Sequence, residues 1–195
     1  MFISLEGIDG SGKTTQAALL ADELGPDTLL VREPGGTDAA ERIRELLADA
    51  ALELDPTAEL LLFLAARADL AATVIAPALA AGRHVVADRF ADSSAAYQGG
   101  ARGLGLERVE QLSDAATEGL APELTLLLRV EIDTATGRFE GEDRFEAEGA
   151  AFQRAVAEAY EQLAARHSDR IVPVDGEGTP EAVHERVMAV VRERL

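Results

Sequence analysis

The sequence contains no cysteine, which excludes disulfide bonds, thiolate metal sites and a cysteine nucleophile. Asparagine and tryptophan are also missing, so the chain cannot form the Asn-Lys-x-Asp motif that reads guanine. Positive charge is scarce, because 18 Lys and Arg face 36 Asp and Glu and leave a net charge of −18. We therefore expect neither a nucleic-acid partner nor an anionic membrane surface, since both are bound by clustered Lys and Arg.

Long uninterrupted apolar runs are lacking as well. Charges interrupt every run before it reaches the ~18–20 apolar residues of a membrane-spanning helix, so no membrane segment is expected. The first residues, Met1–Glu6, show neither a basic region nor an apolar block followed by a cleavage site. With 195 residues, 47% of them hydrophobic, we expect a single domain over residues 1–195 and a cytoplasmic location.

Short apolar runs alternate with longer helical patterns along the chain. Five runs have the length and composition of buried strands: Phe2–Leu5, Thr28–Val31, His84–Ala87, Leu124–Val130 and Ile171–Val174. Six stretches have helical patterns: Thr14–Leu24, Asp38–Leu47, Pro56–Ala81, Leu106–Leu120, Glu148–His167 and Pro180–Arg194. This alternation predicts an α/β fold of three layers, in which a central parallel sheet of about five strands carries helices on both faces.

The segment Gly137–Gly149 breaks the alternation. It is charged, punctuated by glycine and without a clean apolar stripe. Two interpretations stay open, namely a solvated surface loop and a mobile lid that carries Arg138 and Arg144.

A phosphate-binding motif follows the first expected strand. The motif G-x-x-x-x-G-K-[ST] is matched by Gly7, Ile8, Asp9, Gly10, Ser11, Gly12, Lys13 and Thr14. Its glycines let backbone amides wrap around a phosphate, and the helix that follows adds its positive N-terminal end. Lys13, the only lysine of the chain, would reach the β- and γ-phosphates, and the hydroxyl of Thr14 would ligate Mg²⁺. The motif predicts a nucleoside-triphosphate site without indicating which reaction follows.

Three further motifs accompany the expected strands and helices. The segment Arg32–Thr37 has the sequence REPGGT after the second strand, where it could also be a simple connector. Phe63 and Arg67 share one helix face, so they could stack on a base and bond its edge, or be a core aromatic beside a snorkelling cation. A third motif, Asp88–Gly100, begins where the third strand ends, and parallel α/β sheets bind ligands at that edge.

In order and spacing, these motifs resemble those of the bacterial thymidylate kinases, the family that phosphorylates dTMP to dTDP with ATP. The similarity runs from Phe2 to about Gly105 and more loosely to the last helix. It implies a P-loop nucleoside-monophosphate-kinase fold, ATP as phosphate donor, Mg²⁺ as cofactor and a homodimer. Two alternatives stay open: a kinase for another nucleotide or small acceptor on the same fold, and a non-enzymatic P-loop nucleotide switch.

The resemblance also implies roles for individual residues. Phe63 would stack on thymine, and Arg67 would bond a thymine carbonyl. The remaining implied dTMP contacts are Ser94 and Gln98 on the base edge, Tyr97 on the deoxyribose, Arg89 and Arg44 on the phosphate, and Asp9 on the 3′-hydroxyl. Asp88 would join Thr14 near Mg²⁺.

The implied catalytic residues are Asp9, Lys13, Arg89 and an arginine that reaches the transferring group. Some family members supply that arginine from the phosphate loop, but this chain has Gly10 there, so we expect it from the lid. The lid holds two arginines, Arg138 and Arg144, where the family usually has several. This departure leaves open which of the two is catalytic.

Overall fold

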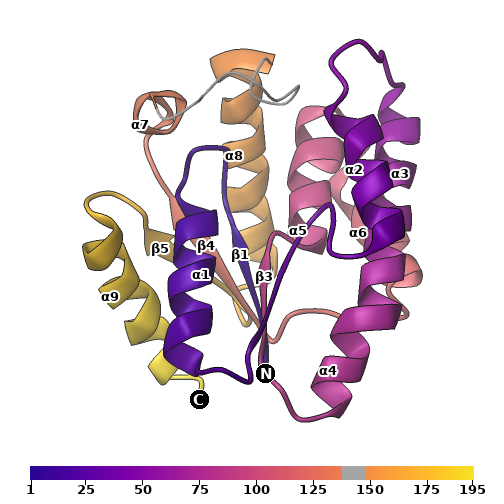
Figure 1. Cartoon of the computed structure of the whole chain (residues 1–195). Coiled ribbons are helices and arrows are strands. Elements are labelled where there is room, and N and C mark those ends of the chain that lie inside the picture. The colour runs from indigo at the N-terminus through magenta and orange to yellow at the C-terminus, as the bar shows by residue number, and fades with distance from the viewer. Residues whose placement is uncertain (138–147) are drawn as a thin grey trace.

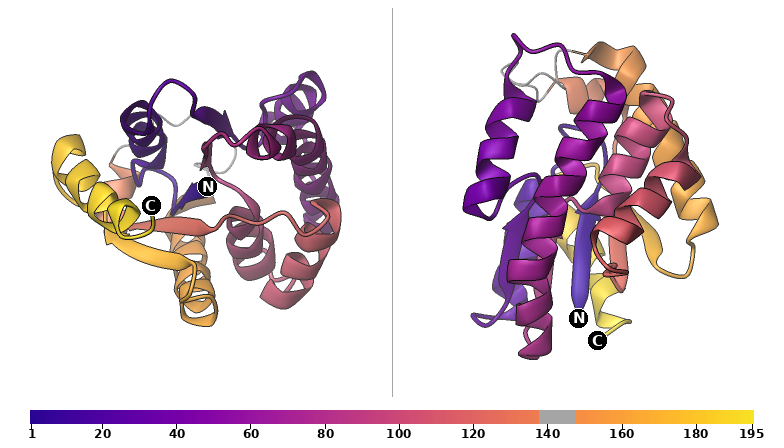
Figure 2. Two further views of the ribbon diagram at one scale, coloured as in Figure 1. Left: turned by 90° about the horizontal axis from the view of Figure 1, so that it is seen from below. Right: turned by 90° about the vertical axis from the view of Figure 1, so that its right-hand side faces the viewer.

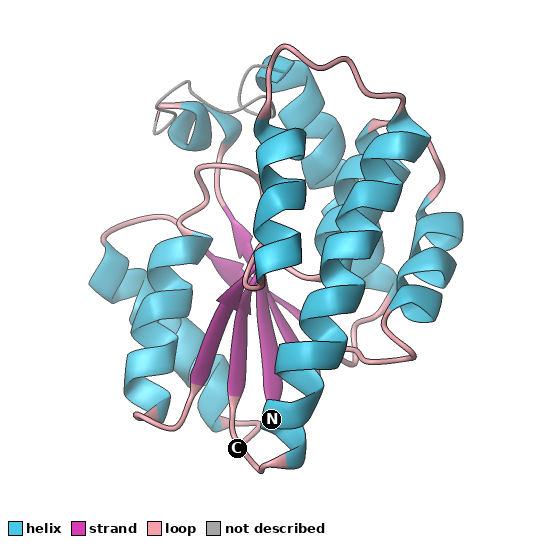
Figure 3. Cartoon of the chain, turned by 45° about the vertical axis from the view of Figure 1, so that its right-hand side comes forward, coloured by secondary structure: helices cyan, strands magenta, loops and turns pink. Residues whose placement is uncertain are grey.

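The computed structural model describes residues 1–137 and 148–195, so Arg138 and Arg144 lie outside the described residues. Five strands form one sheet: β1 (Phe2–Glu6), β2 (Leu29–Arg32), β3 (Val85–Asp88), β4 (Leu124–Arg129) and β5 (Ile171–Asp175). All neighbouring strands are parallel, in the order β2-β3-β1-β4-β5, so their carboxyl ends meet at one edge (Figure 3). The predicted strands are confirmed to within one residue at each end.

The sheet lies between two layers of helices (Figure 1). The α-helices are α1 (Lys13–Leu24), α2 (Asp38–Ala48), α3 (Pro56–Leu70), α4 (Ala76–Ala80), α5 (Ala91–Ser94), α6 (Leu106–Ala116), α7 (Ile132–Thr136), α8 (Gly149–Arg166) and α9 (Pro180–Arg192). Two π-helical segments, η1 (Ala71–Ile75) and η2 (Ala95–Ala101), continue α3 and α5. The six predicted helices are present, whereas α5, η2 and α7 were not predicted.

Alternating side chains of the strands supply the two halves of the core. On β4, Leu126 and Leu128 pack with α1 and α9 on one face of the sheet. Leu127, between them, packs on the opposite face with α3, η2 and α8. Figure 2 shows helices on both sides of the sheet. This pattern confirms the three-layer α/β fold expected from the sequence.

The predicted helix Pro56–Ala81 is helical almost throughout but changes its hydrogen-bond pattern in the middle. The N–H of Ala76 bonds to the carbonyl of Ala71, five residues back. Pro77 follows directly, and proline has no N–H and crowds the carbonyl four residues earlier. The π-helical segment η1 is how the helix accommodates that proline.

Among the described residues, one helical stretch, Pro56–Ala80, is long and apolar enough to cross a membrane by length and composition alone. This finding corrects the expectation that no stretch comes near that limit. It is weak evidence for a membrane segment, because core helices pass the same test. Glu59 and Arg67 of this stretch are each 1% exposed and form ion pairs with Arg102 and Glu33 inside the domain, as fits a core helix.

Candidate functional site

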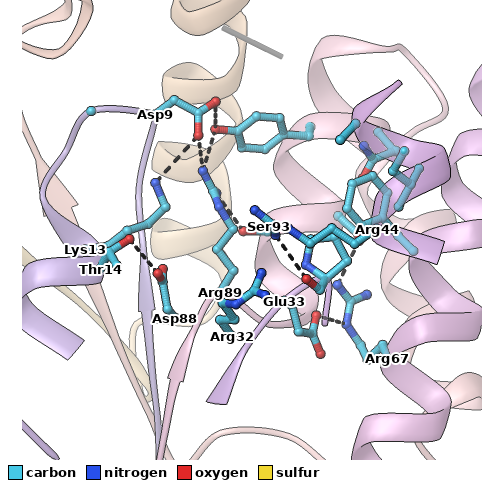
Figure 4. A pocket seen from close by; sticks show the side chains of 18 residues that line it. Asp9, Lys13, Thr14, Arg32, Glu33, Arg44, Arg67, Asp88, Arg89 and Ser93 are labelled. Carbon is cyan, nitrogen blue, oxygen red and sulfur yellow. Dashed lines mark hydrogen bonds and ion pairs between the residues drawn. The ribbon is translucent and has the colours of Figure 1, made fainter. Parts of the chain in front are cut away.

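A cavity of about 560 Å³ opens at the carboxyl edge of the sheet. It is lined by Asp9, Gly10, Lys13, Thr14, Arg32, Glu33, Pro34, Arg44, Leu47, Ala48, Phe63, Arg67, Asp88, Arg89, Ser93, Ser94, Tyr97 and Gln98. Every residue that the resemblance assigns to dTMP lies in this lining, and so do the two expected Mg²⁺ ligands (Figure 4). Residues from five separate stretches of the sequence thus share one cavity.

The phosphate loop connects the end of β1 to the start of α1. Gly7, Gly10 and Gly12 adopt φ angles of 147°, 76° and 88°, in the region that favours glycine. Gly12 precedes α1 and offers no side-chain cap to the first N–H groups of that helix. Those N–H groups therefore remain as donors, and the positive end of the helix dipole coincides with them, which suits a phosphate.

Lys13 lies beneath this loop, with 6% of its surface exposed. Its Nζ donates to the carbonyl of Ile8 at 3.0 Å and lies 3.7 Å from a carboxylate oxygen of Asp9. Burial and the neighbouring charge of Arg89 lower the pKa of Lys13 to about 8, although Asp9 and Asp88 oppose them. Phosphate oxygens beside Nζ would favour its charged form.

Thr14 and Asp88 meet at the mouth of the loop. The Thr14 hydroxyl donates to Asp88 Oδ2 at 2.6 Å, while Asp88 Oδ1 is buried without a hydrogen-bond partner (Figure 4). Within residues 1–137 and 148–195, no group of three His, Cys, Asp or Glu side chains could hold a metal by itself. One hydroxyl and one carboxylate fit Mg²⁺, which keeps several waters and takes its remaining ligands from phosphates.

Arg89 stands at the centre of the cavity, directly after β3. Its φ of 73° is unusual for a residue with a side chain, and such backbone conformations cluster at functional sites. Its guanidinium donates to Asp9, to Ser93 Oγ at 3.0 Å and to the Tyr97 hydroxyl at 3.1 Å (Figure 4). The bonds aim a fixed positive charge into the cavity.

Asp9 holds Arg89 from the phosphate loop. It also accepts from the Tyr97 hydroxyl at 2.8 Å and from Gln153 Nε2 at 3.1 Å. Burial alone would raise the pKa of Asp9, but the charges of Arg89 and Lys13 outweigh it and lower that pKa to about 2. Asp9 is therefore ionised at neutral pH and keeps the arginine in place.

Glu6 supports the turn that carries Arg89, a role that the sequence analysis missed. It accepts hydrogen bonds from the Phe90 N–H at 2.7 Å, the Ser93 hydroxyl at 2.6 Å and the Tyr160 hydroxyl at 2.7 Å. Complete burial, and then repulsion from Asp92, raise the pKa of Glu6 to about 7. An acidic residue that ends an otherwise apolar strand was the signal that could have pointed to it.

Arg67 lies at the other end of the cavity from Lys13. Its Nε donates to Glu33 at 2.8 Å, and its Nη2 donates to the Phe90 carbonyl at 3.1 Å and to Ser94 Oγ at 3.0 Å. Its Nη1 is buried and has no hydrogen-bond partner. Phe63 lines the cavity one turn earlier on α3, so this end combines an aromatic side chain with an arginine that has an unpartnered N–H group.

Arg44 reaches the same cavity from α2, where Nη1 donates to the carbonyl of Pro34 at 3.0 Å. The motif REPGGT, which could have been a simple connector, therefore forms part of the wall. Glu33 of this motif is buried beside Arg67, and burial raises the pKa of Glu33 against the effect of that arginine.

Gly10 has no room for a side chain. A Cβ atom at this position would lie closer than 3.0 Å to the carbonyl oxygen of Ala135 in α7. An arginine at position 10 would therefore displace α7. This contact supports the expectation that the phosphate loop supplies no arginine to the site, while Arg138 and Arg144, the arginines of the expected lid, lie outside the described residues.

Comparisons with known proteins agree on one family. The family model described as thymidylate kinase matches residues 5–187. A thymidylate kinase of Synechococcus sp. (strain JA-2-3B'a(2-13)) is 48% identical over 198 residues, covering 100% of this chain and 96% of the relative. A thymidylate kinase of Chromohalobacter salexigens is 47% identical over 203 residues, covering 100% and 96%. The crystal structure of thymidylate kinase from Ehrlichia chaffeensis matches with a TM-score of 0.80 and 33% identity, covering 98% of each chain.

Proposed function

The chain belongs to the thymidylate kinase family, and from this premise we propose that it transfers the γ-phosphate of ATP to dTMP, giving dTDP and ADP. The observation that carries the proposal is the single cavity that joins a phosphate loop to a base pocket. Lys13 and Thr14 lie at one end of it and Arg67 at the other, with Arg89 between them. Phe63 lines the same cavity one turn before Arg67 on α3. The nucleotide switch that the sequence left open gains no support from these comparisons.

The donor end of the cavity takes ATP. The N–H groups of the loop and Lys13 Nζ bind the β- and γ-phosphates. Thr14 and Asp88 hold Mg²⁺, and the unpartnered Asp88 Oδ1 supports this assignment. When bound, Mg²⁺ supplies positive charge that offsets the charge on the phosphates.

The acceptor end takes dTMP. Phe63 stacks on thymine, Arg67 Nη1 donates to a thymine carbonyl, and Gln98 reads the neighbouring position. Ser94 fixes the Arg67 guanidinium, with which it shares a hydrogen bond of 3.0 Å. Tyr97 lies against the deoxyribose and Asp9 bonds the 3′-hydroxyl.

The transfer needs alignment and charge rather than a general base. An oxygen of the dTMP phosphate attacks the γ-phosphorus in line, a new P–O bond forms, and the bond to the β–γ bridging oxygen breaks as ADP leaves. Arg89, with Arg44 beside it, holds the attacking phosphate. Lys13 and a lid arginine, Arg138 or Arg144, stabilise charge on the transferring group.

We also propose a cytoplasmic homodimer. Three helices on one side of the domain expose leucines, namely Leu46 on α2, Leu61 on α3 and Leu112 on α6, with 49%, 55% and 36% of their surfaces accessible. Apolar side chains of this size are what a second subunit would cover. Sedimentation of the wild type should give the mass of a dimer, and Leu61→Glu should shift it toward the monomer. A wild-type protein that sediments as a monomer would contradict the dimer.

Diphosphate formation from ATP and Mg²⁺ should be measured with dTMP, dUMP, dCMP, dGMP and dAMP, for the wild type beside Arg138→Ala and Arg144→Ala. We expect dTMP to be strongly preferred. The variant of the catalytic lid arginine should lose kcat rather than raise KM. If dTMP yields no diphosphate while ATP still binds, the proposed acceptor is wrong.

A further inference from the structure

A buried carboxylate stands behind the base pocket. Glu59, on α3, is 1% exposed and is not part of the cavity lining. It accepts a hydrogen bond from Gln98 Nε2 at 2.9 Å, and it accepts from Arg102 Nε at 3.3 Å and Nη2 at 3.4 Å. Gln98, by contrast, lines the cavity. Glu59 therefore contacts Gln98, a proposed base contact, from the side that faces away from the cavity.

The chemistry of this contact fixes the direction of the Gln98 amide. A carboxylate that is paired with an arginine is an acceptor only, so it must be faced by the NH₂ group of the amide. The carbonyl oxygen of a planar amide then points the other way. Gln98 thus presents Oε1, an acceptor, to the pocket, and an amide held in the opposite direction would present a donor.

Arg67, another lining residue, is also held in one direction. It uses Nε on Glu33 and Nη2 on Ser94 and Phe90, which leaves Nη1 as a buried donor without a hydrogen-bond partner. The pocket therefore combines one donor from Arg67 with one acceptor from Gln98. Glu33 fixes the direction of the Arg67 guanidinium, and Glu59 fixes that of the Gln98 amide. Neither glutamate is itself proposed to contact the base.

We propose that Glu59 is a specificity-determining residue, which selects thymine over cytosine by fixing the Gln98 amide with its oxygen toward the pocket. The inference rests on the proposed function and refines its base site. Thymine offers the N3–H donor beside the O4 acceptor, which complements Oε1 of Gln98 and Nη1 of Arg67. Cytosine offers the reverse pair, an N3 acceptor beside an amino donor. Uracil offers the same pair as thymine.

The test is Glu59→Gln, which preserves size but gives residue 59 both a donor and an acceptor. The Gln98 amide can then adopt either direction. We expect kcat/KM for dTMP to fall about tenfold, the loss of roughly one hydrogen bond, and that for dCMP to rise. The dTMP:dCMP ratio should therefore fall at least tenfold while the dTMP:dUMP ratio stays within about twofold. Arg67 is unchanged in the variant, so dCMP should remain the poorer substrate.

Two further variants separate this role from a structural one. Arg102→Lys alters a second partner of Glu59 but keeps the positive charge of residue 102 and leaves the Glu59 acceptor in place, so the dTMP:dCMP ratio should stay as in the wild type. In a Gln98→Met background, Glu59→Gln should no longer change that ratio, because no amide is left to orient. Thermal unfolding of each variant checks that it is folded.

A Glu59→Gln enzyme that is folded and slower on dTMP, dUMP and dCMP by the same factor would overturn the inference. An effect that persists in the Gln98→Met background would do so as well. A wild type that does not prefer dTMP over dCMP would count against the proposed function itself, so the two failures are distinguishable.

Discussion

Under the proposed function, Arg67 combines a structural task with a binding task, and mutation can separate them. It is ion-paired with Glu33, which is 6% exposed, and its unpartnered Nη1 is the proposed donor to thymine. Arg67→Met removes both, and leaving a buried carboxylate without its cation costs about 3–5 kcal/mol of stability. We expect urea denaturation to show this loss and KM for dTMP to rise at least about tenfold.

The double variant Arg67→Met/Glu33→Gln removes the unpaired charge. It should regain a large part of the stability without regaining the affinity for dTMP. If both properties returned together, Arg67 would act on the base only through the fold.

Glu6 should make stability depend on pH between about 4.5 and 7. The native protein keeps a proton on Glu6 in this window, because its pKa is raised to about 7 from the model-peptide value of 4.5. The unfolded chain has released that proton, so the native state binds more protons and the free energy of unfolding falls as pH rises. Around Glu6, Asp92 adds to this effect, while Ser93, Arg89 and Tyr160 oppose it.

Glu6→Gln removes the titrating group, so the fall in stability between pH 5 and pH 7 should flatten. Urea titrations at pH 5, 6 and 7 measure the slope, with the exposed Glu158→Gln as a control that keeps it. An unchanged slope in Glu6→Gln would mean that other groups cause it. Asp9 affects stability in a separate pH range. Because its pKa is lowered to about 2, its contribution to stability is lost only as pH falls below about 4.

Many of the residues that line the cavity could be predicted, but Leu47, Ala48 and Ser93 in the lining and the residues that stand behind it could not. Phe63, Arg67 and Arg89 belong to contiguous motifs whose spacing is visible in the chain. Glu6 and Glu59 act through partners that are 84 and 39 residues away in sequence. A single sequence holds no sign of such pairs beyond an acidic residue in an apolar surrounding.

Among the elements, α7 and the phosphate loop are coupled through a glycine. Gly10→Ala should strain a backbone with φ of 76° and also push against Ala135 in α7. Gly103→Ala is a matched control, because Gly103 has φ of 77° and nothing within 4 Å of the added Cβ. We expect the control to lose about 1–2 kcal/mol, the cost of a left-handed residue with a side chain, and Gly10→Ala to lose more.

Equal losses of stability in Gly10→Ala and Gly103→Ala would show that α7 can move away from the added Cβ without a loss of stability. Guanidinium unfolding measures the difference. A larger loss for Gly10→Ala would show that a side chain at position 10 is incompatible with the α7 of this chain.

Strands and long helices could be predicted because short apolar runs alternate with longer helical patterns along the chain, whereas α5 and η2 could not. Residues 91–101 have the sequence ADSSAAYQGGA, which is rich in small residues and has no apolar stripe. Their helical form depends on tertiary packing, since Gly100 lies against Ala159 of α8 so closely that a Cβ would collide with it. The local sequence pattern alone does not indicate the contact between Gly100 and Ala159.

For the whole molecule, the net charge of −18 should make stability depend on salt. Like charges repel one another across the compact domain, and salt shortens the range of that repulsion from ~30 Å at 0.01 M to ~10 Å at 0.1 M. We expect the melting temperature to rise between these concentrations, by roughly 2–4 °C for each kcal/mol gained. Sucrose at equal osmolality is the control, and an equal rise in sucrose would remove charge repulsion as the cause.

Lys13, which we propose as a phosphate ligand, is also a specific site for chemical modification. It is the only lysine among 195 residues, so reagents that acylate side-chain amines have a single target. That target lies in the lining of the cavity, where the triphosphate would cover it. Acylation of the lysine should therefore proceed in the empty enzyme and stop when ATP is added, so that one peptide in a mass spectrum reports how much of the site is occupied.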